Sequence, residues 1–524
     1  MTANRRTTGT GAAIWRDLQL ITPAVGLVVY AMVWLIPALM LAWRIAGGTL
    51  GWDLFEHAAA VRELATHPFQ PGNPILLVDL PHTLFSPYSL LAAAIVRLSG
   101  ADPFDVLSIA GFVNAVILAA GFRAFVRIFT KSDLALILSA AFALFLWGSA
   151  PLHLGVDPWV WSGFLNLDSL SYGLPYPSAV AMGLAFFALS LLATFLQRGG
   201  RLRLAAAVVI QALVVVLHPY SALFIVIGLA ALIVAYGSRL EVRRSVAAVA
   251  AIATGTVVCF AWPYFSIVQL LTGQVGAFDW EQRAMYSAVV LRIFPALVGL
   301  PFLALRFRAD RRDPLAWLFG GLSAVYVVGV LTAHYTLGRE LPYVMICLDI
   351  ALAIGFAGIL SRAPDPEPRQ GRLASLPVRG IVAACLLPVV LLGSAAVVEV
   401  LTTGETHADV EGLARLTSQY DVVLADHASY PAVPTWGGKL VAWYGALGFI
   451  PDIVERRSQA AAFFDPSETL DERLALLRQY GVRWVLYGRN GPTFSAAFEA
   501  SIPQWGKPYA TSPDGAFVLV SVGP

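Results

Sequence analysis

The sequence contains few charged residues. Only 13% of its 524 residues are Asp, Glu, Lys or Arg, about half the share typical of soluble globular proteins, whereas 58% are hydrophobic. The mean hydropathy is +0.71, which excludes a water-soluble enzyme. Because 35 basic residues face 33 acidic ones, the chain also lacks the strong positive field typical of nucleic-acid-binding proteins, and we expect no nucleic-acid partner.

Cysteines and cofactor motifs are also scarce. The three cysteines, Cys259, Cys347 and Cys385, all lie in apolar runs, so we expect no disulfide framework. The polar C-terminal part has no Walker sequence, G-x-G-x-x-G, G-x-S-x-G or zinc-spaced Cys/His set, and the first polar loop has no D-x-D motif. No bound cofactor is therefore predicted, and a requirement for a divalent metal stays open.

Long apolar runs dominate the first 403 residues. A membrane-spanning helix needs about 20 consecutive apolar residues, and runs of this kind predict about eleven spans. They lie near residues 20–43, 104–129, 133–150, 176–196, 204–217, 219–236, 245–271, 286–305, 314–332, 341–360 and 380–401. The predicted fold class is a polytopic α-helical membrane protein, and the first run is too long for a cleaved signal peptide.

Basic residues indicate which ends of the spans face the cytoplasm. Arg and Lys cluster before the first span and then between every second pair of spans, as is typical of cytoplasmic loops. The N-terminus is therefore predicted to be cytoplasmic. The same pattern favours an interfacial helix at Leu84 to Leu98 and a hairpin from Leu204 to Tyr236 that turns at His218 on the outer face.

Residues 404–524 have a different composition, with 9 basic and 13 acidic side chains. Three short runs rich in β-branched residues predict strands at 421–425, 482–487 and 516–522. Together with a helix between the first two strands, they predict a small α/β domain, which the span count places in the periplasm. Residues 1–403 then form the transmembrane domain.

The predicted helix of this domain lies in DPSETLDERLALLRQYG. Asp465 is its expected N-cap, Glu468 completes a capping box, and Gly481 ends it. Elsewhere in the domain, the segments Asp426-His427 and Trp436 to Lys439 either line a sugar or partner surface or are ordinary loop residues.

Ionisable and aromatic residues concentrate in two predicted outer loops, residues 46–103 and 151–176. In the first loop, Asp53 and His57 lie on one face of a predicted helix that also carries Glu56. A carboxylate beside an imidazole suits a general base acting on a hydroxyl or amine, although a solvated interfacial helix has the same spacing. Other residues expected to line this site are His82, Asp157, Trp159, Asp168, Tyr172, His218, His334, Tyr335 and Glu340.

Arg339 is one of six basic residues before Gly404 that lie outside the cytoplasmic clusters. At the outer start of a span, a guanidinium can bind a phosphate through two parallel hydrogen bonds. Snorkelling to ordinary lipid headgroups is the alternative explanation of this arginine.

Four features of the chain resemble the GT-C superfamily of integral-membrane glycosyltransferases, which includes protein O-mannosyltransferases, aminoarabinose transferases and arabinofuranosyltransferases. They are a first span followed at once by GWDLFEH, the segment PHTLFSPYSLLAAAIVRL, the late element GRELPY, and the polar tail. The tail has no W-W-D-Y-G, which argues against an oligosaccharyltransferase. The resemblance implies that Asp53 activates the acceptor and Arg339 binds the donor phosphate, with His57 and His82 lining the site.

The predicted outward orientation of the polar loops limits which sugar donors can reach them. Nucleotide sugars are cytoplasmic, so an outward-facing transferase needs a donor carried across the bilayer, such as a polyprenyl-phosphate sugar. We therefore predict sugar transfer from such a donor to a glycan, lipid or protein acceptor at the outer face of a bacterial cytoplasmic membrane.

Two other classes of protein stay open. A transporter or flippase for a lipid-linked or sugar substrate often has internal repeats and mid-span charges. Here no repeat is evident and such charges are few, with Asp349 the clearest. A non-catalytic cell-envelope assembly protein would not need the Asp53 carboxylate.

Overall fold

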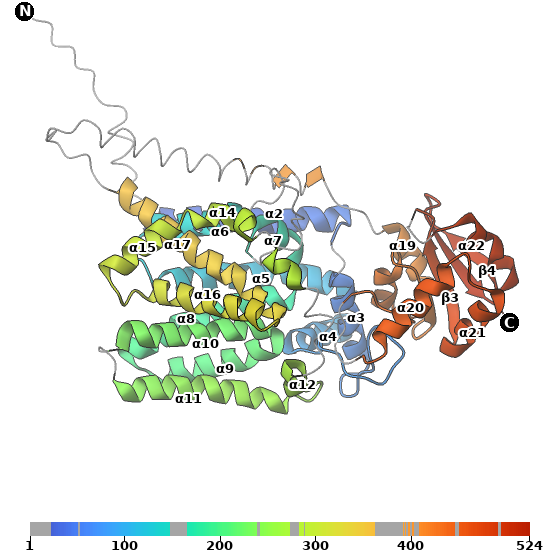
Figure 1. Ribbon diagram of the computed structural model, residues 1–524, viewed down its shortest axis with the longest axis horizontal. Helices are drawn as coiled ribbons and strands as arrows, with labels where there is room; N and C mark the ends of the chain where they lie inside the picture. Colours follow the sequence, from blue (N-terminus) through green and yellow to red (C-terminus); the bar gives the residue numbers. More distant parts are fainter. Residues whose placement is uncertain are drawn as a thin grey trace, which may run out of the picture.

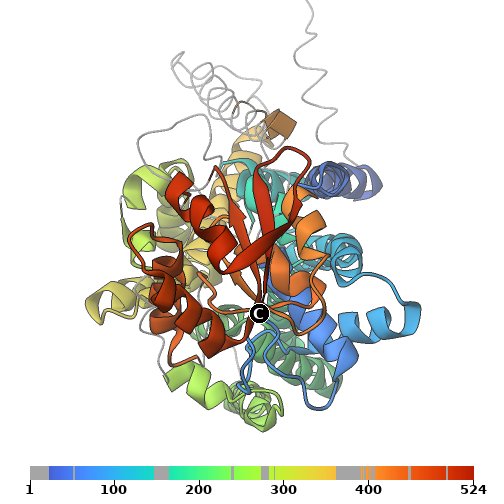
Figure 2. The same cartoon turned by 90° about the vertical axis from the view of Figure 1, so that its right-hand side faces the viewer.

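The computed structural model describes residues 23–523, except 51–52, 147–164, 238–240, 273–281, 288, 362–390, 392–393, 395–396, 399–400, 403–407, 446–449 and 491–493. A bundle of long helices makes up most of the molecule, and a small sheet domain lies at one end of it (Figure 1). Seen along the bundle, this C-terminal domain lies in front of the helix ends (Figure 2). The predicted domain boundary near Gly404 falls outside the described residues.

The bundle confirms the predicted fold class. Within the described residues, seven helices are long and apolar enough to cross a membrane, so the predicted count of eleven is not confirmed. The bundle helices are α2 (Pro23–Gly47), α5 (Pro103–Val126), α6 (Asp133–Phe145), α8 (Pro177–Arg198), α9 (Arg201–Leu217), α10 (Pro219–Tyr236), α11 (Val242–Val258), α14 (Val289–Leu297), α15 (Leu300–Ala309), α16 (Pro314–Leu331) and α17 (Leu341–Leu360).

Several helices begin with a capping side chain followed by proline, which needs no amide partner at the first helical position. Asp102 accepts a hydrogen bond from the Phe104 amide at the start of α5, and Asp313 does the same for the Ala316 amide in α16. His218 ends α9 and caps α10 by accepting from the Ser221 amide. The predicted hairpin that turns at His218 is therefore confirmed.

The predicted span at 286–305 is wrong as a single helix. The chain forms α14 and α15, with a turn at residues 298–299 between them. Pro301, at the start of α15, has no amide hydrogen to continue a helix from the preceding turn. The long predicted run at 245–271 is also interrupted, because α11 and the 3-10 turn η5 (Cys259–Ala261) end before Pro263.

Helices α5 and α8 pack closely because glycines remove the side chains between them. A Cβ atom at Gly121 would collide with the carbonyl group of Gly183, and one at Gly183 would lie 2.9 Å from the Cα atom of Leu118. Beside this contact, the rings of Phe122 and Phe186 meet edge to face at 5.6 Å. Close backbone approach through small residues is typical of helix packing in membranes.

Four short helices among the described residues before the C-terminal domain lie outside the long bundle helices. They are α3 (Asp53–Thr66), α4 (Pro87–Ser99), α7 (Leu167–Gly173) and α12 (Ile267–Thr272). Helix α3 lies between the bundle and the C-terminal domain (Figure 1). The predicted short helix at Leu84 to Leu98 is confirmed as α4, with Ser86 as its N-cap, whereas its interfacial position stays a prediction.

The C-terminal domain is built on a five-stranded sheet in the order β2-β1-β3-β5-β4. Strand β1 is parallel to β2 and β3, and β5 is antiparallel to β3 and β4. All three predicted strands are confirmed, as β1, β3 and β5. The elements are α19 (Ala408–Ala414), β1 (Val422–Ala425), β2 (Lys439–Leu440), α20 (Ile453–Phe464), α21 (Leu470–Tyr480), β3 (Val482–Gly488), α22 (Ala496–Ser501), β4 (Gly506–Thr511) and β5 (Phe517–Val522).

The predicted start of helix α21 is wrong by four residues. Thr469 is its N-cap and forms a capping box with Glu472. Asp465 instead accepts hydrogen bonds from the amide and hydroxyl of Ser467, in the turn that follows α20. The predicted end at Gly481 is confirmed, because this glycine has the left-handed conformation that often ends a helix.

Candidate active site

The first turn of α3 carries three of the predicted site residues. Asp53 and Glu56 lie at its N-terminus, where the helix dipole favours negative charge. His57 lies on the same turn, and its ring stacks on Tyr176 with the centroids 5.1 Å apart. Leu54, Phe55 and Ala58 are buried, so apolar contacts fix the turn that holds these polar groups.

Asp53 lies within the electrostatic reach of Arg339, although the two residues are far apart in the sequence. Arg339 belongs to the 3-10 helix η7 (Tyr335–Glu340), which leads into α17. Desolvation by the surrounding protein raises the pKa of Asp53, and the positive charge of Arg339 partly opposes this rise. The Asp53 residue is nevertheless exposed to water. Protein therefore surrounds this carboxylate without sealing it from a ligand.

Arg339 is held from two sides. Its Nε atom donates a hydrogen bond to Oε1 of Gln282, at 3.1 Å, in the short 3-10 helix η6 (Gln282–Tyr286). Its guanidinium also lies over the ring of Tyr220, 5.6 Å from the centroid. These contacts fix the cation at the end of the bundle where α10 begins.

Glu56 and His82 form a second polar pair. Nε2 of His82 lies 3.5 Å from Oε1 of Glu56. Nδ1 of His82 accepts a hydrogen bond from the Leu84 amide, so Nε2 carries the proton of the neutral ring. Burial, followed by the charge of Asp53, raises the pKa of Glu56 to about 8, and burial lowers the pKa of His82 to about 3. At neutral pH, Glu56 is therefore mostly protonated and His82 is neutral.

Asp168 and Tyr172, both on α7, lie around Arg44 at the end of α2. Arg44 lies 3.5 Å from the Asp168 carboxylate and 5.6 Å from the centroid of the Tyr172 ring. Its Nε atom also donates to the Ser171 hydroxyl at 2.6 Å. Burial, followed by the charge of Asp53 and then by Tyr172, raises the pKa of the Tyr176 phenol. This group therefore adjoins the site through Tyr176.

His218 lies near Arg339, at the start of α10. Its Nδ1 atom is 2.8 Å from the Ser221 hydroxyl, which in turn lies 2.6 Å from the hydroxyl of Tyr343. Burial, followed by the charge of Arg339, lowers the pKa of His218 to about 3. Glu340 is fully buried, and its carboxylate oxygens have no hydrogen-bond partner among the described residues.

Not every predicted residue reaches this group. His334 is exposed and contacts Thr332, and the Tyr335 ring packs against Tyr286 at 5.9 Å. These contacts tie both residues to the segments around the start of α17. Asp157 and Trp159 lie outside the described residues.

The sequence did not reveal that the C-terminal domain adjoins the first loop. Nζ of Lys439 lies 2.9 Å from Oε2 of Glu63 on α3, and both side chains are buried. Thr435 donates a hydrogen bond to the Phe55 carbonyl oxygen. Tyr430 follows β1, and burial together with the charges of Glu56 and Asp53 raises its pKa. Contacts between such distant segments leave no local pattern in the sequence.

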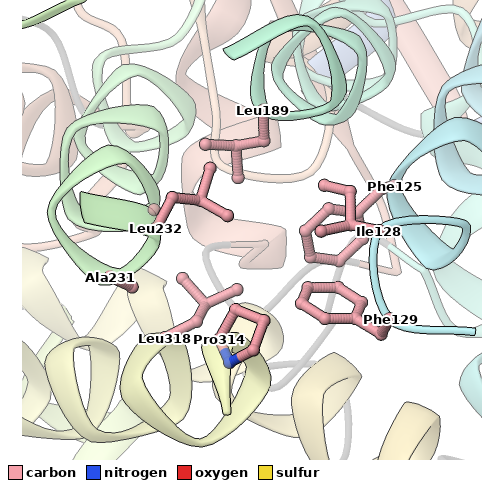
Figure 3. A pocket seen from close by; sticks show the side chains of 9 residues that line it. Phe125, Ile128, Phe129, Leu189, Ala231, Leu232, Pro314 and Leu318 are labelled. Atoms are coloured by element: carbon pink, nitrogen blue, oxygen red, sulfur yellow. The ribbon is translucent and has the colours of Figure 1, made fainter. Parts of the chain in front are cut away.

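An apolar cavity between α5, α8, α10 and α16 is lined by side chains such as Phe125, Leu189, Leu232 and Leu318 and has no acid or base (Figure 3). Within the described part of the chain, no three His, Cys, Asp or Glu side chains are placed to hold a metal ion.

The fold and this site together define a class of protein: a polytopic membrane protein in which a first-loop helix meets a late loop beside a small α/β domain. One similar solved structure is ArnT from Cupriavidus metallidurans bound to undecaprenyl phosphate, with a TM-score of 0.55, 13% identity, and coverage of 98% of this chain and 100% of that chain. Another is the oligosaccharyltransferase AglB from Archaeoglobus fulgidus, in complex with an inhibitory peptide and a dolichol-phosphate. Its TM-score is 0.55 at 11% identity, covering 95% of this chain and 74% of that chain.

Both solved structures are GT-C glycosyltransferases, and the chain has their fold. No protein-family model and no curated protein sequence matches the chain.

Proposed function

We propose that the chain is a GT-C glycosyltransferase that moves a sugar from a polyprenyl-phosphate donor to an acceptor at the outer face of the membrane. The observation that carries the proposal is the proximity of Asp53 and Arg339 at one end of the bundle. Polyprenyl phosphates are bound in the two structures of the same fold, undecaprenyl phosphate in ArnT and dolichol-phosphate in AglB.

The reaction needs a base and a cation at opposite ends of the displacement. Asp53 accepts the proton of the acceptor hydroxyl or amine as this group attacks the anomeric carbon. The bond between that carbon and the phosphate oxygen breaks, and Arg339 stabilises the charge that grows on the departing polyprenyl phosphate. Because Glu56 keeps its proton at neutral pH, it can donate a hydrogen bond while Asp53 acts as the base.

The charge distribution supports an outward-facing site in the cytoplasmic membrane of a bacterium. Arg244 donates hydrogen bonds to the carbonyl oxygens of Leu196 and Gln197, which brings the basic ends of α8 and α11 together. Helix α9 then runs from this basic end to His218, beside Arg339. Positive loops are typical of the cytoplasmic side. We therefore place this basic end of the bundle, and the N-terminus with it, in the cytoplasm. The site and residues 404–524 then lie on the other side.

The proposal is tested by sugar transfer in membranes that contain the full chain. The donors are a panel of radiolabelled polyprenyl-phosphate sugars, and the acceptors are glycan, lipid and peptide fractions. Asp53→Asn removes the base and Arg339→Ala removes the phosphate-binding cation, so each should lower transfer by about 10²-fold or more at equal expression.

Two exposed residues provide matched controls. Asp105→Asn also neutralises a carboxylate in the first turn of a helix, and Arg97→Ala also removes a guanidinium, but neither charge is among the causes that shift the pKa of Asp53. Both controls should keep wild-type transfer. Full activity of Asp53→Asn would remove the proposed base. Donor movement across the bilayer without any transfer would favour a flippase instead.

A further inference from the structure

Four rings of the C-terminal domain gather beyond the carboxyl ends of two neighbouring strands of its sheet. His427 and Tyr430 follow β1, and Trp443 and Tyr444 follow β2. Because β1 and β2 are parallel neighbours, the segments that leave their carboxyl ends lie side by side, where α/β sheets commonly bind ligands. We call these four residues the aromatic cluster.

The rings contact one another closely. The centroids of Tyr430 and Trp443 are 4.8 Å apart, those of Tyr430 and Tyr444 are 5.0 Å apart, and those of His427 and Tyr444 are 5.1 Å apart. Trp443 and Tyr430 are 4% and 7% exposed, whereas Tyr444 is half-buried and His427 is exposed. The cluster therefore has a buried base and an open edge.

The aromatic cluster lies beside the carboxylates of the proposed site. Tyr430 and Trp443 share an apolar core with Phe55, the residue before Glu56. The Thr435 hydroxyl, in the 3-10 helix that begins at Tyr430 (η8, Tyr430–Trp436), donates to the Phe55 carbonyl oxygen at 3.1 Å. The charges of Glu56 and Asp53 also reach Tyr430 and add to the rise of its pKa.

Two charged groups of the C-terminal domain next to the aromatic cluster, Asp426 and Arg457, are engaged by the protein itself. Asp426 accepts hydrogen bonds from the Ser429 hydroxyl at 2.6 Å and from the Gly488 amide at 3.1 Å. Nε of Arg457 donates to the Trp443 carbonyl oxygen at 2.8 Å. The open edge therefore presents ring faces, a phenol and an imidazole. Such a surface stacks on the C–H faces of a sugar and forms hydrogen bonds with its hydroxyl groups.

We propose that His427 and Tyr444, packed on the buried ring of Tyr430, bind a neutral sugar unit of the acceptor, so that the acceptor is a glycan and its hydroxyl is delivered to Asp53. This inference rests on the proposed function. In the transfer step, the acceptor oxygen bonds to the anomeric carbon of the donor sugar as the carbon–oxygen bond to the phosphate breaks. The hydroxyl proton passes to Asp53, and polyprenyl phosphate leaves.

Binding and transfer are measured separately, so that each proposal can fail alone. Binding is followed by saturation-transfer NMR on the full chain in nanodiscs, with mannotetraose, arabinotetraose and galactotetraose as neutral probes and tetragalacturonate as the acidic probe. We expect at least one neutral probe to bind more tightly than the acidic one. His427→Ala and Tyr444→Ala should each weaken that binding by about tenfold, the loss of roughly one ring contact.

The control is Tyr509→Ala, which removes an exposed tyrosine from β4 at the opposite edge of the same sheet. It should bind the probes as the wild type does, and so should Asp53→Asn. If Asp53→Asn keeps binding but loses transfer, both proposals are supported. If the wild type binds the neutral probes but transfers no sugar, only the proposed function is overturned.

Other outcomes overturn the inference alone. In one of them, the wild type transfers sugar, and His427→Ala and Tyr444→Ala have the same acceptor KM as the wild type. Another is failure of every neutral probe to bind. A third is transfer to a peptide or phospholipid and not to a glycan.

Discussion

Replacing Lys439 by methionine should loosen the helix that carries Asp53. Lys439 and Glu63 are 4% and 6% exposed, and their charged atoms are 2.9 Å apart. Nζ of Lys439 also donates to the Asn73 carbonyl oxygen at 2.6 Å. Methionine fills a similar volume but leaves the Glu63 carboxylate buried without its cation, which costs about 3–5 kcal/mol. Since about 1.4 kcal/mol corresponds to a factor of ten, opening of α3 should rise by roughly 10²-fold to about 4,000-fold.

Hydrogen exchange of the α3 amides, measured by mass spectrometry on the full chain in nanodiscs, reports this opening. The double variant Glu63→Gln, Lys439→Met removes both charges and should recover most of the protection, because a buried pair replaced as a whole is often neutral in stability. Arg483→Met is the control. Arg483 pairs with Asp421 at 3.0 Å but is 62% exposed, so its loss should cost at most about 1 kcal/mol.

Wild-type exchange rates in Lys439→Met would contradict a role of the buried pair in holding α3. A double variant that exchanges as fast as the single one would also contradict it, because the defect would then come from lost packing and not from an unpaired charge.

Two further predictions concern the base and the bundle. Arg339 lowers the raised pKa of Asp53, so Arg339→Gln should raise this pKa further. The acid limb of the pH profile of kcat/KM, measured on the residual activity, should then move to higher pH. An unmoved limb would mean that Asp53 does not titrate in the reaction. Gly121→Ala places a methyl group against the Gly183 carbonyl and should destabilise the bundle by about 1–3 kcal/mol. Thermal unfolding in nanodiscs checks this second prediction. The control is Gly320→Ala, whose Cβ would meet nothing within 4 Å, and it should unfold at the wild-type temperature or slightly above it, because alanine favours a helix more than glycine does.

Local patterns predicted the parts of the fold that depend on neighbouring residues. Apolar runs bounded by capping residues and proline located helices such as α5 and α16, and β-branched runs located β1, β3 and β5. The start of α21 was misplaced because two possible N-caps, Asp465 and Thr469, lie only four residues apart. Strand β2 has only two residues, and β4 contains Pro508 and has mostly exposed side chains, so neither has a recognisable strand pattern.

Residues of the candidate site could be predicted one by one, whereas most of their contacts could not. Asp53 and Arg339 lie in short motifs that directly adjoin predicted spans, so the resemblance could assign them roles. The stacking of His57 on Tyr176 and the pair Glu63–Lys439 join segments far apart in the chain. Nothing near Lys439 in the sequence indicates that its partner lies on the helix of the first loop, because such a contact exists only after both parts have folded.

These long-range contacts link the C-terminal domain to the chemistry that we propose for α3. One face of α3 is fixed by the bundle, since Leu54 and Ala58 belong to the core formed by the long helices. The other is fixed by the C-terminal domain, since Phe55 belongs to its core and Arg62 donates to the Thr435 carbonyl oxygen at 2.6 Å. The distance from Asp53 to Arg339 therefore depends on both parts. A change in the docking of the domain would move the proposed base relative to the proposed phosphate site without altering either residue.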